Sequence, residues 1–349
     1  MLDKISLLEF GPEELKEELA SLELPNFRFA QIPRWYFARK AGSISEMTDL
    51  PLTLREKLAE KYTVFAAEML AHRKSDDGTE KLLLQWPDGH RVECVLLRDD
   101  RNHRTACISI QVGCAMGCLF CASGLDGFVR NLTRGEMIEQ ILRLNQLLPK
   151  TERLTHLVIM GTGEPLLNLP SLLSALNAVT SQENLDISKR RVTISTVGLP
   201  QGIEKLADAE VSYRLAVSLH APNDVLRNRI VPQNRHTGIQ KIMAASDYFF
   251  EKTGRRVTFE YVLIDSLNDS REHAQELTAL LRNRTAIVNL IPFNPVQGLP
   301  YKTPSPTATR DFAETLQNNG IDMKIRFRKG NSINAACGQL RRSWKESKE

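Results

Sequence analysis

The stretch GCAMGCLFC, residues 113–121, places three cysteines within one short segment. Three thiolates at this spacing can each bind one iron of a cubane iron–sulfur cluster and leave the fourth iron open to a small molecule. A zinc site or a set of buried structural thiols is the alternative. Zinc would need a further ligand nearby, and residues 122–135 contain neither Cys nor His. We therefore predict a cluster held by Cys114, Cys118 and Cys121.

This CxxxCxxC loop resembles the signature of the radical S-adenosylmethionine (SAM) enzymes. The resemblance implies that the open iron binds the amino and carboxylate groups of SAM and that the cluster reduces the sulfonium. The spacing is specific for the superfamily, but it does not name a substrate.

Composition sets broad limits on the protein. The chain has 349 residues, of which 42% are hydrophobic, so a sizeable core and two or three domains are expected. No apolar run reaches about 18 residues, and the first residues lack a signal pattern, so we expect a cytoplasmic protein without membrane association. Six cysteines with three in one loop indicate cofactor and thiol chemistry in a reducing compartment. The net charge of +4 permits an anionic partner without requiring one.

From residue 106 onward, apolar β-branched runs alternate with helical patterns. Such alternation predicts βαβ units and a parallel sheet, and therefore an α/β fold. Six units fit a partial (β/α)6 barrel, although an open doubly wound sheet has the same periodicity. The predicted strands are Ala106–Val112, Leu154–Met160, Arg191–Val197, Tyr213–His220, Arg256–Ile264, Ala286–Asn294 and Met323–Arg328, and helices are predicted at Arg134–Leu148, Arg271–Leu281 and Thr309–Asn318.

Two further pieces precede the barrel. Residues 11–70 read as helical, with Leu15, Leu19 and Leu22 on one stripe, and a second helix carries Phe29, Ile32, Trp35 and Phe37. Lys81–Trp86 and Arg91–Leu97 flank a Pro-Asp-Gly-His turn and predict a β-hairpin. We expect a helical accessory domain at 1–70, a hairpin extension at 71–105, the barrel at 106–330, and a loop and tail at 331–349.

Polar and small residues gather where the predicted strands end. Because the carboxyl ends of parallel strands meet at one edge, these residues should share one site. Gly163 and Glu164 offer a carbonyl and a carboxylate to the SAM amine, and the other candidates offer hydrogen bonds to ribose, carboxylate and adenine. Each alone is more often an internally bonded polar group. The predicted SAM-binding residues are Gly163, Glu164, Ser195, Ser218, Leu219, His220 and Asn294.

Three cysteines remain outside the cluster loop. A free Cys is usually a small buried hydrophobe, and we expect this of Cys94. Cys107 lies on the first barrel strand. Cys337 lies in a segment rich in Gly and Ala, which suggests a loop that can approach a ligand closely.

A narrower resemblance covers residues 90–342. Its most specific motifs are Asn-Leu-Thr after the cluster loop, Gly-Glu-Pro-Leu-Leu-Asn, Ser-Leu-His-Ala-Pro-Asn-Asp and Ala-Ala-Cys-Gly-Gln-Leu. With these motifs the chain resembles the radical SAM adenine methyltransferases that modify ribosomal RNA. The resemblance implies methylation of adenine carbon 2 in 23S rRNA, with tRNA as a second substrate. A branch that methylates carbon 8 shares the same cysteines, and a non-methylating iron–sulfur redox or RNA-binding protein is the alternative of a different class.

The resemblance also implies a relay. Cys337 accepts a methyl group from one SAM, and a second SAM, reduced by the cluster, yields a radical that activates the methyl group for addition to adenine. Glu93 removes the ring proton, although a solvated carboxylate on the hairpin is its ordinary interpretation. Cys107 then attacks Cys337, forming a transient disulfide that releases the product. We further expect two SAM per turnover, an electron donor such as a flavodoxin, and a monomer.

An RNA partner has direct support from local basic clusters, which we expect near the carboxyl ends of the strands or near the Cys337 loop. A solvated basic face is the ordinary meaning of each cluster. They comprise Lys189–Arg191, Arg227 with Arg229, Arg326 with Arg328 and Lys329, and Arg341 with Arg342. The chain departs from the family at Thr162, where Met is usual, and at Ser332 and Asn334, where Asp is typical. These departures leave the position of the substrate open.

Overall fold

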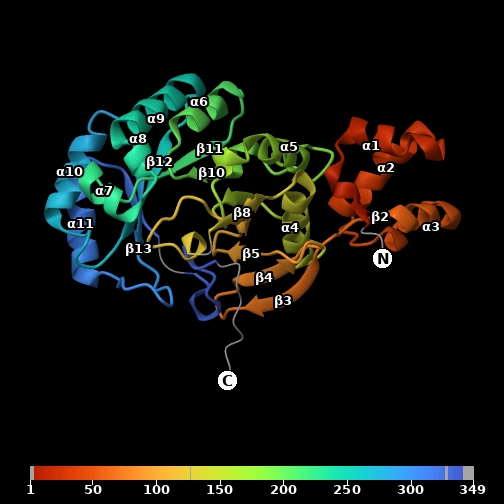
Figure 1. Cartoon of the computed structure of the whole chain (residues 1–349), viewed down its shortest axis with the longest axis horizontal. Coiled ribbons are helices and arrows are strands. Elements are labelled where there is room, and N and C mark those ends of the chain that lie inside the picture. Colours follow the sequence, from red (N-terminus) through yellow and green to blue (C-terminus); the bar gives the residue numbers. More distant parts are fainter. Residues whose placement is uncertain (1–3, 126, 327–328, 341–349) are drawn as a thin grey trace.

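A computed structural model describes residues 4–125, 127–326 and 329–340 of the chain (Figure 1). Its centre is one ten-stranded sheet in the order β14-β13-β12-β11-β10-β9-β6-β5-β4-β3. The seven strands from β6 to β14 are parallel, and β3, β4 and β5 extend the sheet in antiparallel fashion. The strands are β3 (Glu68–Lys74), β4 (Glu80–Gln85), β5 (Arg91–Arg98), β6 (Arg104–Cys107), β9 (His156–Ile159), β10 (Val192–Thr196), β11 (Arg214–Ser218), β12 (Val257–Leu263), β13 (Ala286–Pro292) and β14 (Met323–Ile325).

Helices connect the parallel strands and cover the outer face of the sheet (Figure 1). The protein therefore has a partial (β/α)6 barrel, as predicted, and the inner face of its sheet lines cavities. The helices are α4 (Arg134–Gln146), α5 (Leu169–Thr180), α6 (Pro200–Asp208), α7 (Asp224–Ile230), α8 (Asn234–Thr237), α9 (Ile239–Thr253), α10 (Arg271–Leu281) and α11 (Pro306–Asn318).

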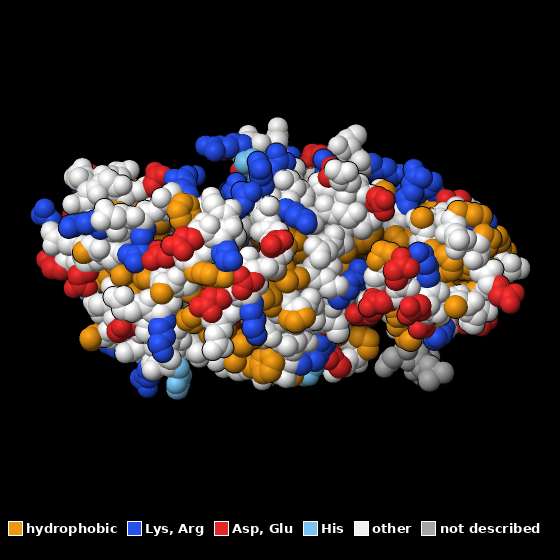
Figure 2. Space-filling view, turned by 90° about the horizontal axis from the view of Figure 1, so that it is seen from above, with side chains coloured by type: hydrophobic (Ala, Val, Ile, Leu, Met, Phe, Trp, Pro, Cys, Tyr) orange, Lys and Arg blue, Asp and Glu red, His pale blue; other side chains and the backbone are white. Residues whose placement is uncertain are grey.

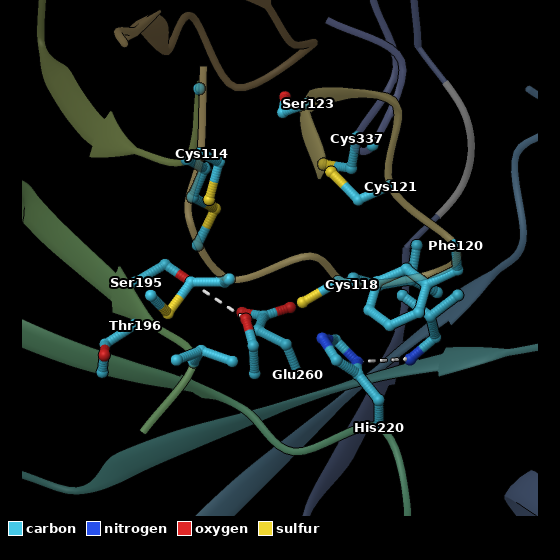
Figure 3. A pocket seen from close by; sticks show the side chains of 18 of the residues that line it. Cys114, Cys118, Phe120, Cys121, Ser123, Ser195, Thr196, His220, Glu260 and Cys337 are labelled. Carbon is cyan, nitrogen blue, oxygen red and sulfur yellow. Dashed lines mark hydrogen bonds between the residues drawn. The ribbon is translucent and has the colours of Figure 1, made fainter. Parts of the chain in front are cut away.

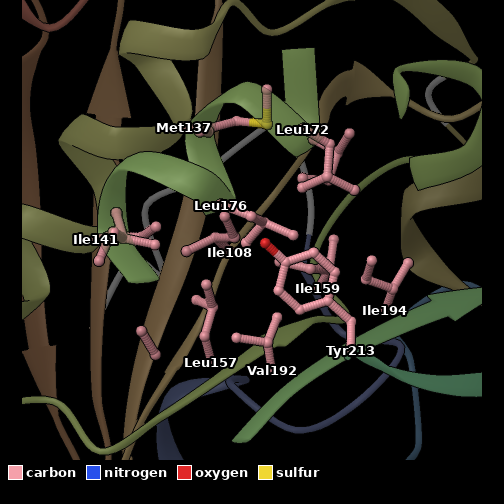
Figure 4. Close-up of a cluster of buried hydrophobic side chains, with 14 of the residues drawn as sticks. Ile108, Met137, Ile141, Leu157, Ile159, Leu172, Leu176, Val192, Ile194 and Tyr213 are labelled. Carbon is pink, nitrogen blue, oxygen red and sulfur yellow. The ribbon is translucent and has the colours of Figure 1, made fainter. Parts of the chain in front are cut away.

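The main core fills the space between the sheet and these helices (Figure 4). Side chains of a strand alternate between its two faces, so Leu157 and Ile159 of β9 point outward into this core. Val158, between them, points inward and lines a cavity. The alternation is the reason why strands buried on one face carry functional residues on the other.

The first predicted barrel strand is broken, which corrects the prediction of one strand at 106–112. β6 ends at Cys107, and β7 (Gln111–Gly113) pairs antiparallel with β8 (Phe128–Asn131) in a separate small sheet. Between them, Ser109 donates its backbone N–H to the Gln140 side chain at 2.9 Å and not to a strand. The cluster loop therefore connects β7 to β8 and does not follow a barrel strand directly.

The amino-terminal helices are α1 (Pro12–Glu18), α2 (Asn26–Phe37) and α3 (Leu52–Lys61). β1 (Ile5–Ser6) pairs in parallel with β2 (Tyr62–Thr63) and so joins the two ends of this region. Leu15 and Leu19 are buried as expected. The helical reading to residue 70 is wrong after Lys61, because β2 and β3 follow.

The predicted hairpin is present as β4 and β5, where Gln85 lies opposite Arg91. The last predicted strand is shorter than expected, and Arg328 lies outside the described residues. The domain boundaries stay a prediction. No helix in the described part of the chain is both long and apolar enough to cross a membrane.

Candidate active site

The three predicted cluster ligands lie in one loop between β7 and β8 (Figure 3). The loop begins at Gly113, which has a φ of 74°; a Cβ atom there would lie 1.7 Å from the carbonyl oxygen of Gly127. Leu119 donates its backbone N–H to the carbonyl of Ile230 at 3.0 Å. Ala122 donates likewise to Gly338 at 2.8 Å. Contacts with α7 and with the carboxyl-terminal segment therefore hold the cysteines in place.

The cysteine loop fits a cluster better than a single metal ion. Cys114, Cys118 and Cys121 are half-buried and line a common cavity with apolar neighbours such as Phe120. Burial raises the pKa of Cys114 to about 11, so a positively charged metal group is needed to hold thiolates here. Among the described residues, no three His, Cys, Asp or Glu side chains are placed to bind one ion. A mononuclear zinc site would bring its ligands to about 2.0–2.3 Å from one point, whereas a cubane takes one thiolate per iron.

The cavity beside these cysteines, called here the first cavity, lies at the carboxyl ends of the parallel strands. Ser195 is the last residue but one of β10 and Ser218 ends β11, and their hydroxyl oxygens are 3.5 Å apart. Figure 3 shows Ser195 at this cavity. Six of the seven predicted SAM-binding residues line the first cavity: Gly163, Glu164, Ser195, Ser218, His220 and Asn294. The seventh, Leu219, does not; its side chain is fully buried in the main core and its backbone bonds to Glu260 and Arg227.

Glu164 shapes the first cavity through its own hydrogen bonds. Its carboxylate accepts the backbone N–H of Leu166 at 3.1 Å and that of Val197 at 2.8 Å. Burial raises the pKa of Glu164 to about 7. Gly163 beside it has a φ of 108°, and a Cβ atom there would lie 2.6 Å from Gln111. The Gly-Glu pair therefore joins the loops after β9 and β10.

His220 presents a neutral ring to the first cavity. Its Nδ1 accepts the backbone N–H of Val262 at 3.1 Å, and its ring packs edge-on against Phe120 with centroids 4.7 Å apart. Burial and the nearby Arg227 lower the pKa of His220 to about 3. Because Nδ1 is an acceptor in a neutral ring, Nε2 carries the proton and is a donor. A SAM group that accepts a hydrogen bond would suit this position.

Cys337 lies where the first cavity meets a second. It is exposed, and its carbonyl accepts a hydrogen bond from the Asn294 side chain at 3.1 Å. The other polar atom of that side chain, Oδ1, is buried without a partner. Figure 3 shows Cys337 on the same side of the pocket as Cys121. Both cysteines line both cavities.

The second cavity lies between β5, β6, β9, β10 and the segment that carries Cys337. Cys107 lines it and is buried, and burial raises its pKa to about 12. All six cysteines are free thiols, so no disulfide joins Cys107 to Cys337 in this structure. Both thiols nevertheless border one cavity. Cys94 is fully buried in the main core, where we expected it.

Glu93 is not the solvated carboxylate that is the ordinary reading of a hairpin residue. It is buried on β5 and forms an ion pair with Lys81, with Oε1 and Nζ 2.7 Å apart. Lys81 also donates to the carbonyl of Asn334 at 3.1 Å, so the pair touches the segment that carries Cys337. Glu93 does not line either cavity, but Val95 and Leu97 on the same face of β5 line the second.

Sequence reasoning missed Glu260 and Met160, and it named Arg326 only as part of a basic cluster for RNA. Glu260 of β12 lines the first cavity; it is buried, its Oε2 has no hydrogen-bond partner, and burial raises its pKa. Arg326 lines both cavities, and so does Met160, whose sulfur is 3.7 Å from an Arg326 nitrogen. A signal for Glu260 existed, because it is the only charged residue in the buried strand VTFEYVL.

The predicted basic clusters are only partly available to RNA. Arg227 is 1% exposed and donates to backbone carbonyls and Asn234, so it is no phosphate contact. Arg191 precedes β10 and therefore lies at the opposite end of the strand from Ser195, but it lines the second cavity, as Cys337 does. Arg326 and Lys329 line the second cavity. Arg328, Arg341 and Arg342 lie outside the described residues.

The residues that depart from the family pattern have internal partners. The Thr162 hydroxyl is 3.2 Å from that of Ser123. The Ser332 hydroxyl is 2.8 Å from that of Ser75, ahead of β4. At Asn334 the backbone carbonyl accepts from Lys81. The contacts of Ser332 and Asn334 attach the Cys337 segment to the antiparallel extension.

Comparison with known proteins agrees with this geometry. Residues 108–278 match the radical SAM superfamily, and residues 5–64 match the ribosomal RNA large subunit methyltransferase N-terminal domain. A probable dual-specificity RNA methyltransferase RlmN from Rhodopirellula baltica is 54% identical over 99% of this chain and 93% of that protein. The chain belongs to the RlmN family of radical SAM methyltransferases. A relative with the same name from Carboxydothermus hydrogenoformans is 42% identical over 98% of this chain and 99% of that protein.

The same family membership extends to solved structures. A radical SAM methyltransferase from Sphaerobacter thermophilus has a TM-score of 0.94 and 41% identity, covering 97% of this chain and all of that one. The chain is thus a radical SAM enzyme of the RNA methyltransferase class, with a 4Fe–4S cluster and SAM as its cofactors. The predictions of family, fold, enzyme class and cofactors are confirmed. The non-methylating alternative is not supported.

Proposed function

We propose that this enzyme methylates carbon 2 of adenine in 23S rRNA and in tRNA through a methyl group carried on Cys337. The position of Cys337 is the observation that carries the proposal, because it alone among the non-ligand cysteines lines both cavities. The relatives are named dual-specificity RNA methyltransferases, and the amino-terminal match names the large ribosomal subunit. Carbon 8 of the same base is the alternative product.

Carbon 2 of adenine is electron-poor, so it does not attack the methyl group of SAM, and a carrier nucleophile divides the reaction into feasible steps. In the first step the Cys337 thiolate attacks the methyl carbon of SAM: a new sulfur–carbon bond forms, the bond to the sulfonium breaks, and S-adenosylhomocysteine leaves. Although Cys337 as a residue is exposed, the protein atoms around its thiol remove water from it, and this desolvation together with Glu260 raises the pKa of Cys337, whereas the Arg326 guanidinium opposes the shift. Arg326 therefore favours the thiolate in this cavity.

A bound 4Fe–4S cluster would supply one electron for reductive cleavage of a second SAM. The radical obtained from that SAM would activate the methyl group on Cys337. Cys114, Cys118 and Cys121 would hold that cluster. Gly163, Glu164, Ser195, Ser218, His220 and Asn294 would orient SAM, with the His220 Nε2–H as donor.

Release of the product requires a proton acceptor and a second thiol. Glu93 is the proposed acceptor, and Lys81 would have to share or yield its contact with that carboxylate. Besides the ring proton, the adduct with the base must lose one electron, for which the oxidised cluster would be the acceptor. The Cys107 thiolate then attacks the sulfur of Cys337: a disulfide bond forms, the sulfur–carbon bond breaks, and the carbon keeps the electron pair and gains a proton. A thiol reductant restores the two cysteines before the next turnover.

The test is methylation of a 23S rRNA fragment by the cluster-loaded enzyme, followed by mass spectrometry of the nucleosides. We expect 2-methyladenosine; 8-methyladenosine would overturn the carbon-2 assignment. Cys337→Ala should retain iron but form no product, and Cys107→Ala should accumulate an RNA–protein crosslink. Cys94→Ala is the matched control and should release product normally. Normal turnover by Cys107→Ala would contradict the relay.

The proton acceptor has its own test. Glu93→Gln should slow product formation while methylation of Cys337 by SAM continues. Glu260→Gln is the matched comparison, since Glu260 is also a buried carboxylate but lines the first cavity. If only Glu260→Gln stalls after RNA addition, the assignment of Glu93 is wrong.

A further inference from the structure

The second cavity extends to the amino ends of the parallel strands, away from the SAM-binding residues. Side chains two residues apart on a strand share a face. On β10, Ser195 lines the first cavity and Thr193 lines the second; on β11, Ser218 and Arg214 are divided in the same way. The inner face of the sheet is thus one continuous surface, with Cys337 at its middle. In a closed barrel this interior is filled with bulky apolar side chains.

Cations surround the outer part of this second cavity. Five of its lining residues are Lys or Arg and one is Asp, namely Arg98, Arg191, Arg214, Arg326, Lys329 and Asp99. Arg98 is paired with Glu80, and Asp99 with His103. Arg191 and Arg214 are exposed, and neither side chain has a hydrogen bond or ion pair among the residues that the structure describes. Two guanidinium groups are therefore free to bind an anion at the rim.

The two free arginines lie beside a pair of histidine rings. Strand register places Thr193 opposite Arg214, and Arg191 directly precedes the pair of Val192 with Leu157. His156 begins β9, and its ring meets that of His103 with centroids 4.3 Å apart. Both histidines line the second cavity. Flat rings next to free guanidinium groups are the combination with which proteins hold unpaired nucleotides.

The inner part of the cavity is apolar, in contrast to its rim. Val95, Leu97, Val158 and Leu340 line it around Cys107. Polarity thus changes from charged at the amino ends of the strands to apolar near the two thiols. A nucleotide has the matching order, because its phosphates are anionic and its base is flat and largely apolar. Figure 2 shows Lys and Arg side chains gathered along one edge of the molecule beside a histidine, whereas elsewhere in this view they alternate with acidic ones.

We propose that the target adenine enters the second cavity from the amino ends of the parallel strands, with the flanking phosphates on Arg191 and Arg214 and a neighbouring base against His103 and His156. This inference rests on the proposed function, since it names how RNA reaches Cys337. The base and SAM then approach Cys337 from opposite sides, so SAM methylates the thiol without competing with RNA for space. The substrate has to be an unpaired or flipped-out nucleotide.

The test compares Arg191→Gln/Arg214→Gln with Arg190→Gln. Arg190 is adjacent to Arg191 and exposed, but it does not line the cavity. The probe is a 23S rRNA fragment with a single-stranded adenine. We expect kcat/KM for the double variant to fall about a hundredfold, and the slope of log affinity against log salt to become less steep by about 1.4, or about 0.7 per phosphate contact. Arg190→Gln should stay within about twofold of the wild type.

Methylation of Cys337 by SAM without RNA separates the two proposals. It should be equal in the wild type and the double variant, because the first cavity is unchanged. Thr193→Trp, which places a large ring inside the second cavity, should also block RNA methylation and spare this step. RNA methylation by the double variant within about twofold of wild type would overturn the entry route. A wild-type enzyme that methylates neither Cys337 nor RNA would instead overturn the proposed function.

Discussion

Replacement of Arg227 by Met should destabilise the SAM-binding side of the barrel, although Arg227 lines no cavity. Arg227 is 1% exposed and donates to the carbonyls of Leu219 at 2.9 Å and Ser218 at 3.0 Å. It also donates to the Val197 carbonyl and to Asn234 at 2.6 Å. One side chain therefore joins the ends of β10 and β11 to α7 and α8.

The expected loss can be worked from these four contacts. A hydrogen bond to a charged group contributes about 1.5–3 kcal/mol. The four do not add in full, because Met fills part of the volume and the desolvation cost of the cation disappears. We expect a net loss of about 3–5 kcal/mol, comparable to removal of one partner from a buried ionic contact. At about 2 °C per kcal/mol for a chain of this size, Tm should fall by about 6–10 °C.

The assay is thermal unfolding at fixed scan rate and protein concentration, with SAM binding measured on the cluster-loaded protein. SAM should bind at least about tenfold more weakly, because Ser218 and His220 flank the released carbonyls. Arg227→Lys keeps the positive charge but lacks the planar guanidinium group with its several N–H donors. It should therefore recover only part of the stability lost in Arg227→Met. Arg229→Met is the control on the same helix, where an exposed side chain should cost less than about 0.5 kcal/mol. A Tm for Arg227→Met within about 2 °C of wild type would refute the reasoning.

Three further predictions concern other parts of the site. Gly163→Ala should lower stability by several kcal/mol, because its φ is 108° and the added Cβ would lie 2.6 Å from a neighbouring side chain; Gly254→Ala, with open space around it, should cost only about 1–2 kcal/mol in urea unfolding. Alkylation of Cys107 should accelerate about tenfold per pH unit from pH 7 to 10, because its raised pKa of about 12 leaves the thiol protonated throughout; a plateau near pH 9 would show an unperturbed thiol. Lys81→Met should lower the free energy of unfolding by about 3–5 kcal/mol, because the buried Glu93 carboxylate loses its ion pair with Lys81. The double variant Lys81→Met/Glu93→Leu should regain most of this stability, and urea unfolding measures both variants.

The most successful sequence-based predictions rest on local physics. The helix at Arg271–Leu281 has the predicted bounds, because the periodicity of apolar residues and the Ser270 cap are local features. The β4–β5 hairpin follows from its turn residues. Ser195, Ser218 and Asn294 line one cavity because parallel strands bring their ends to a common edge.

The errors arise where distant groups compete for the same chain. The break after Cys107 depends on Gln140 and the loop after β9, which take the hydrogen bonds of the expected strand. Leu219 was assigned with its motif, but it lies between Ser218 and His220, and the alternation of side chains along an extended chain places it on the opposite face, in the main core. Glu93 is buried because Lys81 lies on the adjacent strand, which no local pattern reveals.

Spacing alone indicated the class of chemistry and predicted Cys114, Cys118 and Cys121 as the cluster ligands, because a short loop can offer its thiolates to a cubane whatever surrounds it. Only the tertiary structure decided that Cys107 and Cys337 border one cavity, that Arg227 is buried, and that Arg191 lies at the far end of β10 from Ser195. The physical reason is that burial and pairing depend on residues far apart in the chain, whereas spacing is a property of the chain itself.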